Sequence, residues 1–285
     1  MCRDIEISCP SLCHPDSIRS CFACCPPIRP QGYEHIQYRR AVERMLRENT
    51  ASFDRDSEAI VPITGYSCWA LGYLDPAYRL VGCLLHPAQN DGKEMRFRVD
   101  YGLKCARELC PQAKAFERLS KEAKEFWVGL VRGLDSFQYS SKIYNPLFRL
   151  LGWARPILES ISERESGGAP TLEVLQSRYP FLRVRLDPRA CTFLVVVALE
   201  KGGKEIIGSK GLLELIHKVV EKMRQEFGPQ ENGGNGYYTH KLSLDRHLLD
   251  FVRLTLGLRK VGVQKAREIE NRTIELVETM GRSLI

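Results

Sequence analysis

The sequence has little that would place the chain in a membrane or outside a cell. No apolar run reaches the roughly 18 residues that a membrane-spanning helix needs. The first ten residues, MCRDIEISCP, carry an early acidic residue and no apolar core, unlike a secretory signal peptide. We therefore expect a cytoplasmic protein without a membrane partner. In that reducing compartment, clustered cysteines bind metals or do redox chemistry more often than they form structural disulfides.

Common enzyme motifs are missing as well. The chain has neither a G-x-G-x-x-G after a predicted strand nor a G-x-x-x-x-G-K-[ST] loop, which argues against the common nucleotide-binding sites. It also lacks H-E-x-x-H and G-x-S-x-G, and its acidic residues are scattered. The sequence therefore assigns no catalytic residue and leaves open whether the protein is an enzyme.

Charge of one sign is not concentrated in long blocks. The chain carries 42 Lys and Arg against 35 Asp and Glu, a net charge of +7, and the two signs are interspersed, as in KEAKEF and KAREIE. Such mixing is typical of a solvated surface. Helical spacing does place Arg40, Arg44 and Arg47 on one face. Because zinc-finger spacing and interleaved aromatics are absent, nucleic acid ranks last among the partners we consider.

Cysteine, by contrast, is abundant and unevenly distributed. Ten of the eleven cysteines lie in the first 110 residues, and only Cys191 lies beyond. This shift predicts a cysteine-rich module over residues 1–116 and a mainly helical domain over residues 117–285. The expected fold class is α+β and mostly helical, with a small metal-organised N-terminal module that contains a β-hairpin and a helical C-terminal half.

Within the module, residues 1–31 are rich in Pro, Cys and Ser and show little periodicity, so burial alone cannot order them. Helical spacing follows over residues 33–49. The segment SCWALGYLDPAYRLVGCLLHP predicts a hairpin that turns at Asp75-Pro76. FRVDYGLKCARELC predicts a strand or loop that leads into a helix ending near Cys110.

The second half has clearer helical patterns. Ser120 and Thr171 are candidate N-caps, and further helices are expected at 146–161, from Gly211 to Met223, and at 243–257 and 262–281. The alternation over residues 182–186 predicts a short strand. TFLVVVALE fits either a hairpin or a buried helix, and ENGGNG is a predicted loop.

The candidate metal ligands form two clusters along the chain. Thiolate sulfur is a soft ligand that suits zinc and iron–sulfur clusters, and C-x-x-C is a spacing at which two sulfurs reach one ion. The first cluster holds Cys9, Cys13, His14, Cys21, Cys24 and Cys25, and the second holds Cys83, His86, Cys105 and Cys110. We assign the metal to eight cysteines: Cys9, Cys13, Cys21, Cys24, Cys25, Cys83, Cys105 and Cys110.

Eight thiolates are enough for two four-cysteine sites, although His14 or His86 could replace one of them. Neighbouring side chains of an extended backbone point to opposite faces, so Cys24 and Cys25 do not readily bind one ion. Either they serve two metals, or one of them packs or reacts. The sequence is equally consistent with Cys68 as a core residue and as a metal ligand. It leaves His86 open between a cap of the turn before Pro87 and a metal ligand. Cys2 is assigned no role, and Cys191 is expected to be a small buried residue.

These cysteines carry a resemblance to a known family. Cys21-x-x-Cys24-Cys25, Gly82-Cys83-x-x-His86-Pro87 and Cys105-x4-Cys110 resemble the YkgJ-like CxxCxxCC family of zinc- or iron-chelating proteins, which includes the cysteine-rich part of FliB-type flagellin lysine methylases. The likeness covers residues 9–112 and implies that its six cysteines are ligands of an iron–sulfur cluster or Zn²⁺. The chain departs from the family pattern in the eight-residue step from Cys13 to Cys21, in the long segment between Cys83 and Cys105, and in lacking an Arg-Pro step before a late cysteine.

Three functions are consistent with these observations. In the first, metal organises the N-terminal module and the helical half binds an unknown protein or small molecule. In the second, an iron–sulfur enzyme of FliB-like type modifies a protein or small substrate. In the third, a zinc-stabilised module presents its arginines to nucleic acid. Visible colour separates the second function from the others, and salt-dependent retention on DNA identifies the third.

Overall fold

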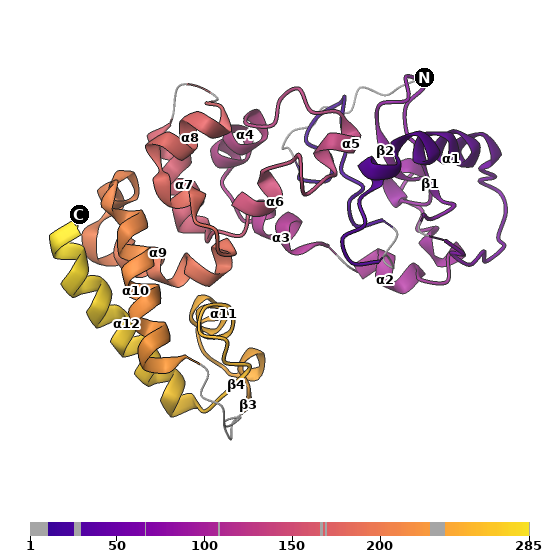
Figure 1. Ribbon diagram of the computed structural model, residues 1–285. Coiled ribbons are helices and arrows are strands. Elements are labelled where there is room, and N and C mark those ends of the chain that lie inside the picture. Colours follow the sequence, from indigo (N-terminus) through magenta and orange to yellow (C-terminus); the bar gives the residue numbers. More distant parts are fainter. Residues whose placement is uncertain are drawn as a thin grey trace. The chain divides into compact units, whose positions relative to one another are not determined.

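The computed structural model describes residues 11–25, 30–65, 67–107, 109–165, 168, 170–228 and 237–284. It is 57% helix and 5% strand, with a small cysteine-rich hairpin region near the N-terminus, so the expected fold class is confirmed. The chain divides into two compact units, Met1–Phe148 and Arg149–Ile285 (Figure 1). The boundary expected after residue 116 therefore falls inside the first unit.

The first unit combines one hairpin with short helices. Its strands and α-helices are β1 (Leu71–Tyr73), β2 (Val81–Cys83), α1 (Arg39–Ser52), α2 (Gly102–Arg107), α3 (Pro111–Glu117), α4 (Lys121–Gly129) and α5 (Ser136–Tyr139). α6 (Leu147–Leu150) spans the boundary. The second unit has α7 (Arg155–Arg164), α8 (Leu172–Arg178), α9 (Pro188–Gly202), α10 (Gly211–Phe227), α11 (Arg246–Leu254), α12 (Val263–Leu284), β3 (Tyr237–Tyr238) and β4 (Lys260–Val261).

The predicted hairpin at Asp75-Pro76 is confirmed. β1 and β2 pair antiparallel, with Gly72 opposite Gly82. The Asp75 carboxylate closes the turn, because Oδ1 accepts hydrogen bonds from the backbone N–H groups of Arg79 (2.8 Å) and Leu80 (2.7 Å). This is the local backbone pairing for which aspartate is favoured in turns. α1 lies alongside β1 (Figure 1) and covers one side of the hairpin.

The helix predicted to end near Cys110 is α2, and a second helix begins directly after Cys110. α2 ends at Arg107, and Cys110 is the N-cap of α3, its sulfur accepting a hydrogen bond from the Ala113 N–H at 3.3 Å. Pro111 explains the new start, because proline suits the first turn of a helix and interrupts the interior of one.

In the second unit, the strand predicted at residues 182–186 is wrong. Pro180–Arg183 forms a 3-10 turn, and no strand is assigned to the five residues 182–186. The Arg149 guanidinium donates hydrogen bonds to the carbonyl oxygens of Val184 and Leu186, the latter at 2.9 Å. A side chain therefore satisfies carbonyls that a partner strand would otherwise have bonded.

The other helical predictions of the second half are mostly confirmed. TFLVVVALE lies in α9, so the buried-helix alternative is correct. The helix expected over 146–161 is instead two helices, because the chain turns at Gly152 and Pro156 opens α7. Ser120 and Thr171 cap α4 and α8 as predicted. The ENGGNG segment lies outside the described residues.

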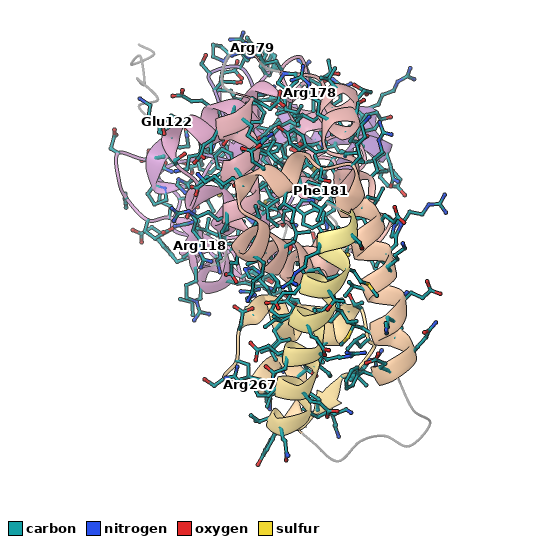
Figure 2. The ribbon with its side chains drawn as sticks, turned by 90° about the vertical axis from the view of Figure 1, so that its left-hand side faces the viewer. Arg79, Arg118, Glu122, Arg178, Phe181 and Arg267 are labelled. Carbon is teal, nitrogen blue, oxygen red and sulfur yellow. The ribbon has the colours of Figure 1, made fainter. Side chains whose placement is uncertain are left out.

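α9 is the buried helix of the second unit. Most of its side chains are buried, and α10, α11 and α12 contact it. Phe181 lies in the 3-10 helix Pro180–Arg183, which contacts α8 and α10, and Figure 2 shows Arg267 pointing outward from α12. Phe181 lies edge-on to Trp153, with ring centroids 5.2 Å apart. No helix in the described part of the chain is long and apolar enough to cross a membrane.

Candidate metal centre

Most of the cysteines of the first unit line one cavity of about 1020 Å³. Its walls come from the N-terminal loop, the β1–β2 hairpin and the segment that carries α2 and α3. The lining includes eight cysteines and two histidines: Cys13, Cys21, Cys24, Cys25, Cys68, Cys83, Cys105, Cys110, His14 and His86. The volume is at the upper end of the range usual for ligand pockets.

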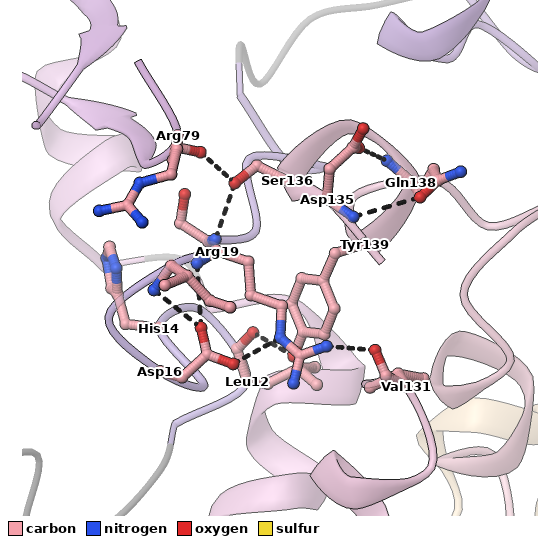
Figure 3. Close-up of polar contacts among 12 residues, drawn as sticks. Leu12, His14, Asp16, Arg19, Arg79, Val131, Asp135, Ser136, Gln138 and Tyr139 are labelled. Carbon is pink, nitrogen blue, oxygen red and sulfur yellow. Dashed lines mark hydrogen bonds and ion pairs between the residues drawn. The ribbon is translucent and has the colours of Figure 1, made fainter. Parts of the chain in front are cut away.

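Buried polar contacts attach the N-terminal loop to α5 and its neighbours (Figure 3). The Tyr139 hydroxyl donates to the Leu12 carbonyl at 3.0 Å. Arg19 is almost fully buried, pairs with the Asp16 carboxylate at 2.6 Å and donates to the Val131 carbonyl. The loop thus gains order from side-chain contacts with residues more than 100 positions away.

Ser20 fixes the start of the C-x-x-C-C run against the hairpin. Its hydroxyl oxygen donates to the Val81 carbonyl and accepts from the Val81 N–H, both at 2.7 Å. Its own N–H donates to the Ser136 hydroxyl at 3.1 Å. Ser136 in turn donates to the Arg79 carbonyl at 2.5 Å (Figure 3), so Ser20 is joined directly to β2 and, through Ser136 of α5, to the residues just before β2.

Phe22 anchors the middle of the same run. Its side chain is only 2% exposed and lies edge-on to Phe137, with ring centroids 5.2 Å apart. Its N–H donates to the Ser140 hydroxyl at 2.9 Å, and its carbonyl accepts from the Cys25 N–H at 3.1 Å. The buried phenyl ring and the backbone hydrogen bonds of Phe22 therefore hold the segment with Cys21, Cys24 and Cys25 at the cavity wall.

His35 holds the end of the run, a role that the sequence did not indicate. The ring is buried, and Nε2 donates to the Cys25 carbonyl oxygen at 2.6 Å. The Tyr33 hydroxyl lies 3.4 Å from the other ring nitrogen, Nδ1. His35 thus acts on Cys25 through the backbone, and no spacing rule in the sequence links the two residues.

Cys13, Cys21, Cys24 and Cys110 line the same cavity, and Cys13 and Cys21 are influenced by the other two. The Cys21 N–H donates to the Cys13 carbonyl at 2.8 Å, which brings the two loop cysteines together. Burial, together with the nearby Cys24, Cys110 and Glu117, raises the pKa of the Cys13 thiol to about 12. Burial also raises the pKa of Cys21, again with contributions from Cys24, Cys13 and Cys110. We call these four residues the loop group.

Cys25, Cys68, Cys83 and Cys105 form a second set, which we call the hairpin group. The Cys25 thiol donates to the Cys68 sulfur, which raises the pKa of Cys25 and lowers that of Cys68. Burial raises the pKa of Cys83 to about 12, with further contributions from Cys68 and Cys105. Burial raises the pKa of Cys105 as well, again assisted by Cys68.

The two cavity histidines have different surroundings. His86 caps the turn that begins at Pro87, since its Nδ1 accepts from the Ala88 N–H at 3.1 Å. This is one of the two roles that the sequence left open for His86. Burial lowers the pKa of both His14 and His86, and for His14 the nearby His86 lowers it further.

Basic side chains also belong to this region. The Arg96 guanidinium donates to the Cys105 carbonyl at 3.1 Å and is paired with Glu94. On α1, Arg47 lies over the Tyr78 ring, 4.3 Å from its centroid, and Arg44 lies 3.9 Å from the Glu48 carboxylate. Two of the three arginines considered for nucleic acid thus have partners within the protein.

Of the eight cysteines assigned to metal from the sequence, seven line the cavity and Cys9 lies outside the described residues. Cys68 joins them, although the sequence left it open between core and ligand. Cys191 lies in α9 of the second unit, fully buried, and burial raises its pKa to about 12. It is the small buried residue that the sequence predicted.

The described cysteines line the cavity walls instead of converging on one point. Among the residues that the structure describes, no three His, Cys, Asp or Glu side chains are grouped closely enough to hold a single ion as they stand. Burial opposes the thiolate form of Cys13, Cys21, Cys25, Cys83 and Cys105 by raising their pKa. A cation that offsets the negative charge would favour several thiolates together. The donor set, soft sulfur throughout, suits zinc or iron–sulfur chemistry.

Comparisons of this chain with protein-family models, with curated proteins and with solved structures found no match. The cavity and its cysteines are therefore the features from which a function can be inferred.

Proposed function

We propose that the protein is a thiolate-rich metal-binding protein, of the type that the YkgJ-like resemblance implies. The observation that carries the proposal is the gathering of eight cysteines around one cavity in the first unit. These residues come from four separate stretches of a 285-residue chain. Their shared location is hard to explain by packing alone, because apolar residues fill a core without leaving a cavity of this size.

The size of the cavity favours an iron–sulfur cluster over zinc. A four-cysteine zinc site closes its sulfurs around one ion at about 2.3 Å and leaves no empty space. Cysteines spread around about 1020 Å³ suit a bulkier group made of several iron and sulfide ions. The cysteines would hold such a cluster, and the cluster would supply redox or Lewis-acid chemistry when bound.

The metal would also organise the first unit. The N-terminal loop is rich in proline and cysteine, and polar contacts to Ser136, Ser140 and Tyr139 hold it in place. Such contacts each contribute only about 1 kcal/mol to stability. Metal bonds to several cysteines of this loop would stabilise it far more. The unfolded chain does not hold these cysteines together, so the free energy of metal binding is gained only when the unit folds.

Metal analysis of protein purified without oxygen tests the proposal. We expect brown protein that contains iron and acid-labile sulfide and absorbs broadly in the visible range. Colourless protein with stoichiometric zinc would support the metal-binding function and replace the cluster with zinc. Protein that contains neither metal while its cysteines remain reduced would contradict the proposal.

A pair of matched variants tests the location of the metal. Cys24→Ser should lower the metal content and destabilise the first unit, since it removes a sulfur from the cavity wall. Cys191→Ser changes a fully buried cysteine of the second unit and should leave the metal content unchanged. Equal metal loss in both variants would show that the cavity is not the binding site.

A further inference from the structure

Two adjacent exposed tyrosines set one surface of the second unit apart. Tyr237 is 72% exposed and Tyr238 is 49% exposed, and both belong to β3. All other phenylalanine, tryptophan and tyrosine side chains of this unit are buried: Trp153, Tyr179, Phe181, Phe193, Phe227 and Phe251. Burying an aromatic ring stabilises a fold, so neighbouring rings that stay in solvent point to a contact with a partner.

Strand pairing directs Tyr238 outward. β3 and β4 pair antiparallel, with Tyr238 opposite Lys260 and Tyr237 opposite Val261. Directly opposite residues lie on the same face of such a ribbon. Val261 is buried, whereas Tyr238 and Lys260 are exposed. Tyr238 and Lys260 therefore share the solvent-facing side of the ribbon, which lies beside α11 (Figure 1).

The next residue, Thr239, fixes this ribbon to the body of the unit. It is only 1% exposed, and its N–H donates to the Arg259 carbonyl at 2.9 Å. Its hydroxyl donates to the Leu258 carbonyl at 2.7 Å. The segment Thr239–Lys241 also contacts α11. The side chains on either side of Thr239 are thus presented from an ordered backbone.

Three basic side chains surround the Tyr238 ring. Lys260 Nζ lies 5.0 Å from the ring centroid, and Lys241 Nζ lies 5.8 Å from it. The centroid of the His240 ring is 5.7 Å away, with the two rings tilted by 34°. A cation–π contact at an exposed position is weak, so both ammonium groups can exchange it for an anionic ligand. We call these four residues, Tyr238, His240, Lys241 and Lys260, the ribbon surface.

Positive charge around the ribbon surface is not balanced locally. Residues 237–260 carry five Lys and Arg against two Asp. Asp245 caps α11 by accepting from the Leu248 N–H at 2.9 Å, and Asp250 pairs with Arg253 at 2.7 Å. Within the described part of the chain, no ion pair involves the other four basic residues: Lys241, Arg246, Arg259 and Lys260.

We propose that the ribbon surface binds single-stranded nucleic acid. The Tyr238 ring would stack on an unpaired base while the Lys241 and Lys260 ammonium groups contact phosphates beside it. An aromatic ring among cations combines the two elements of sequence-tolerant single-strand binding. This inference goes beyond the proposed function, because it concerns the other unit and requires no metal.

Other anionic partners use only part of this surface. An acidic peptide would pair with the lysines and leave the exposed ring without a role. A duplex keeps its bases stacked on one another, so it offers the ring no base face. A single strand supplies both phosphates and open base faces. The sequence alone did not indicate this site, because Tyr238 and Lys260 are 22 positions apart and only strand pairing joins them.

Fluorescence anisotropy of the whole chain with labelled oligonucleotides tests the proposal. The probes are oligo(dT) and oligo(U) of about 12 nucleotides, within the site sizes usual for small single-strand-binding domains. Tyr238→Leu should weaken binding about tenfold through loss of stacking, whereas Tyr238→Phe keeps the ring and should match wild type. No binding of either strand, or equal affinities of Tyr238→Leu and wild type, would overturn the proposal.

Lysine variants test the phosphate contacts. Lys241→Gln/Lys260→Gln should make the slope of log affinity against log salt concentration shallower by about 1.4, since each phosphate contact on a single strand contributes about 0.7. The matched control, Lys201→Gln/Lys218→Gln, removes two lysines of the same unit that pair with Glu278 and Glu214. It should leave the slope unchanged. Equal changes in both double variants would show diffuse charge attraction and overturn the site.

Competition tests the class of partner. Unlabelled duplex DNA and polyglutamate are added to the complex with the single strand, and weak competition by both would support the proposal. A duplex that competes as well per nucleotide as a single strand would overturn the stacking contact. Polyglutamate that competes equally well would assign the surface to an acidic protein and overturn the proposal.

Discussion

Phe22 shows how one apolar side chain positions three cysteines. Its ring fills the space between Phe137 and His35, and its backbone groups bond Ser140 and Cys25. The sequence marks this residue only as the apolar position inside SCFACCPP. Phe137 and Ser140 lie more than 100 residues away along the chain, so no local pattern could reveal that Phe22 is buried.

Replacing Phe22 with alanine should lower the free energy of unfolding by about 3–5 kcal/mol, the usual cost of truncating a buried phenylalanine. Chemical denaturation followed by circular dichroism measures the change. Phe97→Ala is the matched control, because Phe97 is 51% exposed and its loss should change stability by no more than about 0.5 kcal/mol. Equal effects of the two substitutions would contradict the anchoring role of Phe22.

Residue-scale patterns predicted some features of the site and missed others. The cysteine spacing indicated a metal site and the separate roles of Cys24 and Cys25, which remain predictions. Local hydrogen bonding explains why Ser120, Thr171 and Asp75 were correctly predicted as caps and turn residues. His35 was missed, because its bond to the Cys25 carbonyl depends on the folded backbone and not on sequence spacing.

At the scale of elements, the short helix α5 supports the loop that carries the first cysteines. A capping box begins it, in which the Asp135 side chain bonds the Gln138 N–H and the Gln138 side chain bonds the Asp135 N–H. α5 and the residue after it present Ser136 and Ser140 to Ser20 and Phe22. The position of the loop therefore depends on the end of a helix more than 100 residues later.

Asp135→Ala should reduce stability by about 1 kcal/mol through loss of the cap, and it should make Cys21 and Cys25 of metal-free protein react faster with iodoacetamide. Asp245→Ala removes the corresponding cap of α11 in the second unit. That control should cost a similar amount of stability and leave the reactivity of both cysteines unchanged. Faster alkylation in both variants would mean that α5 has no specific role in holding the loop.

Elements with strong local signals were predicted best. The hairpin at Asp75-Pro76 and the amphipathic helix α10 follow from turn chemistry and periodicity. The strand predicted at residues 182–186 is not formed, because an alternating pattern does not by itself supply a partner strand. The Arg149 guanidinium instead donates hydrogen bonds to the carbonyl oxygens of Val184 and Leu186. The helix predicted to end near Cys110 is α2, whereas the sequence patterns did not indicate the separate helix α3 that begins at Pro111.

At the scale of the whole molecule, the first unit extends beyond the cysteine-rich segment. Composition alone suggested a boundary after residue 116, whereas the compact unit runs to Phe148. The difference arises because α4 and α5 contribute no cysteines and yet belong to the same compact unit. Arg19 contacts Val131, and Ser20 contacts Ser136, across more than 100 residues of sequence. Contacts between residues so far apart depend on the fold, so the amino-acid composition could not indicate where the first unit ends.

The proposed function makes the cysteines of this unit the direct ligands of a metal. X-ray absorption at the edge of the bound metal, measured on protein purified without oxygen, tests that claim most directly. We predict a first shell made of sulfur at about 2.3 Å, the usual length of a metal–thiolate bond. A first shell dominated by nitrogen or oxygen, or protein without any bound metal, would contradict it.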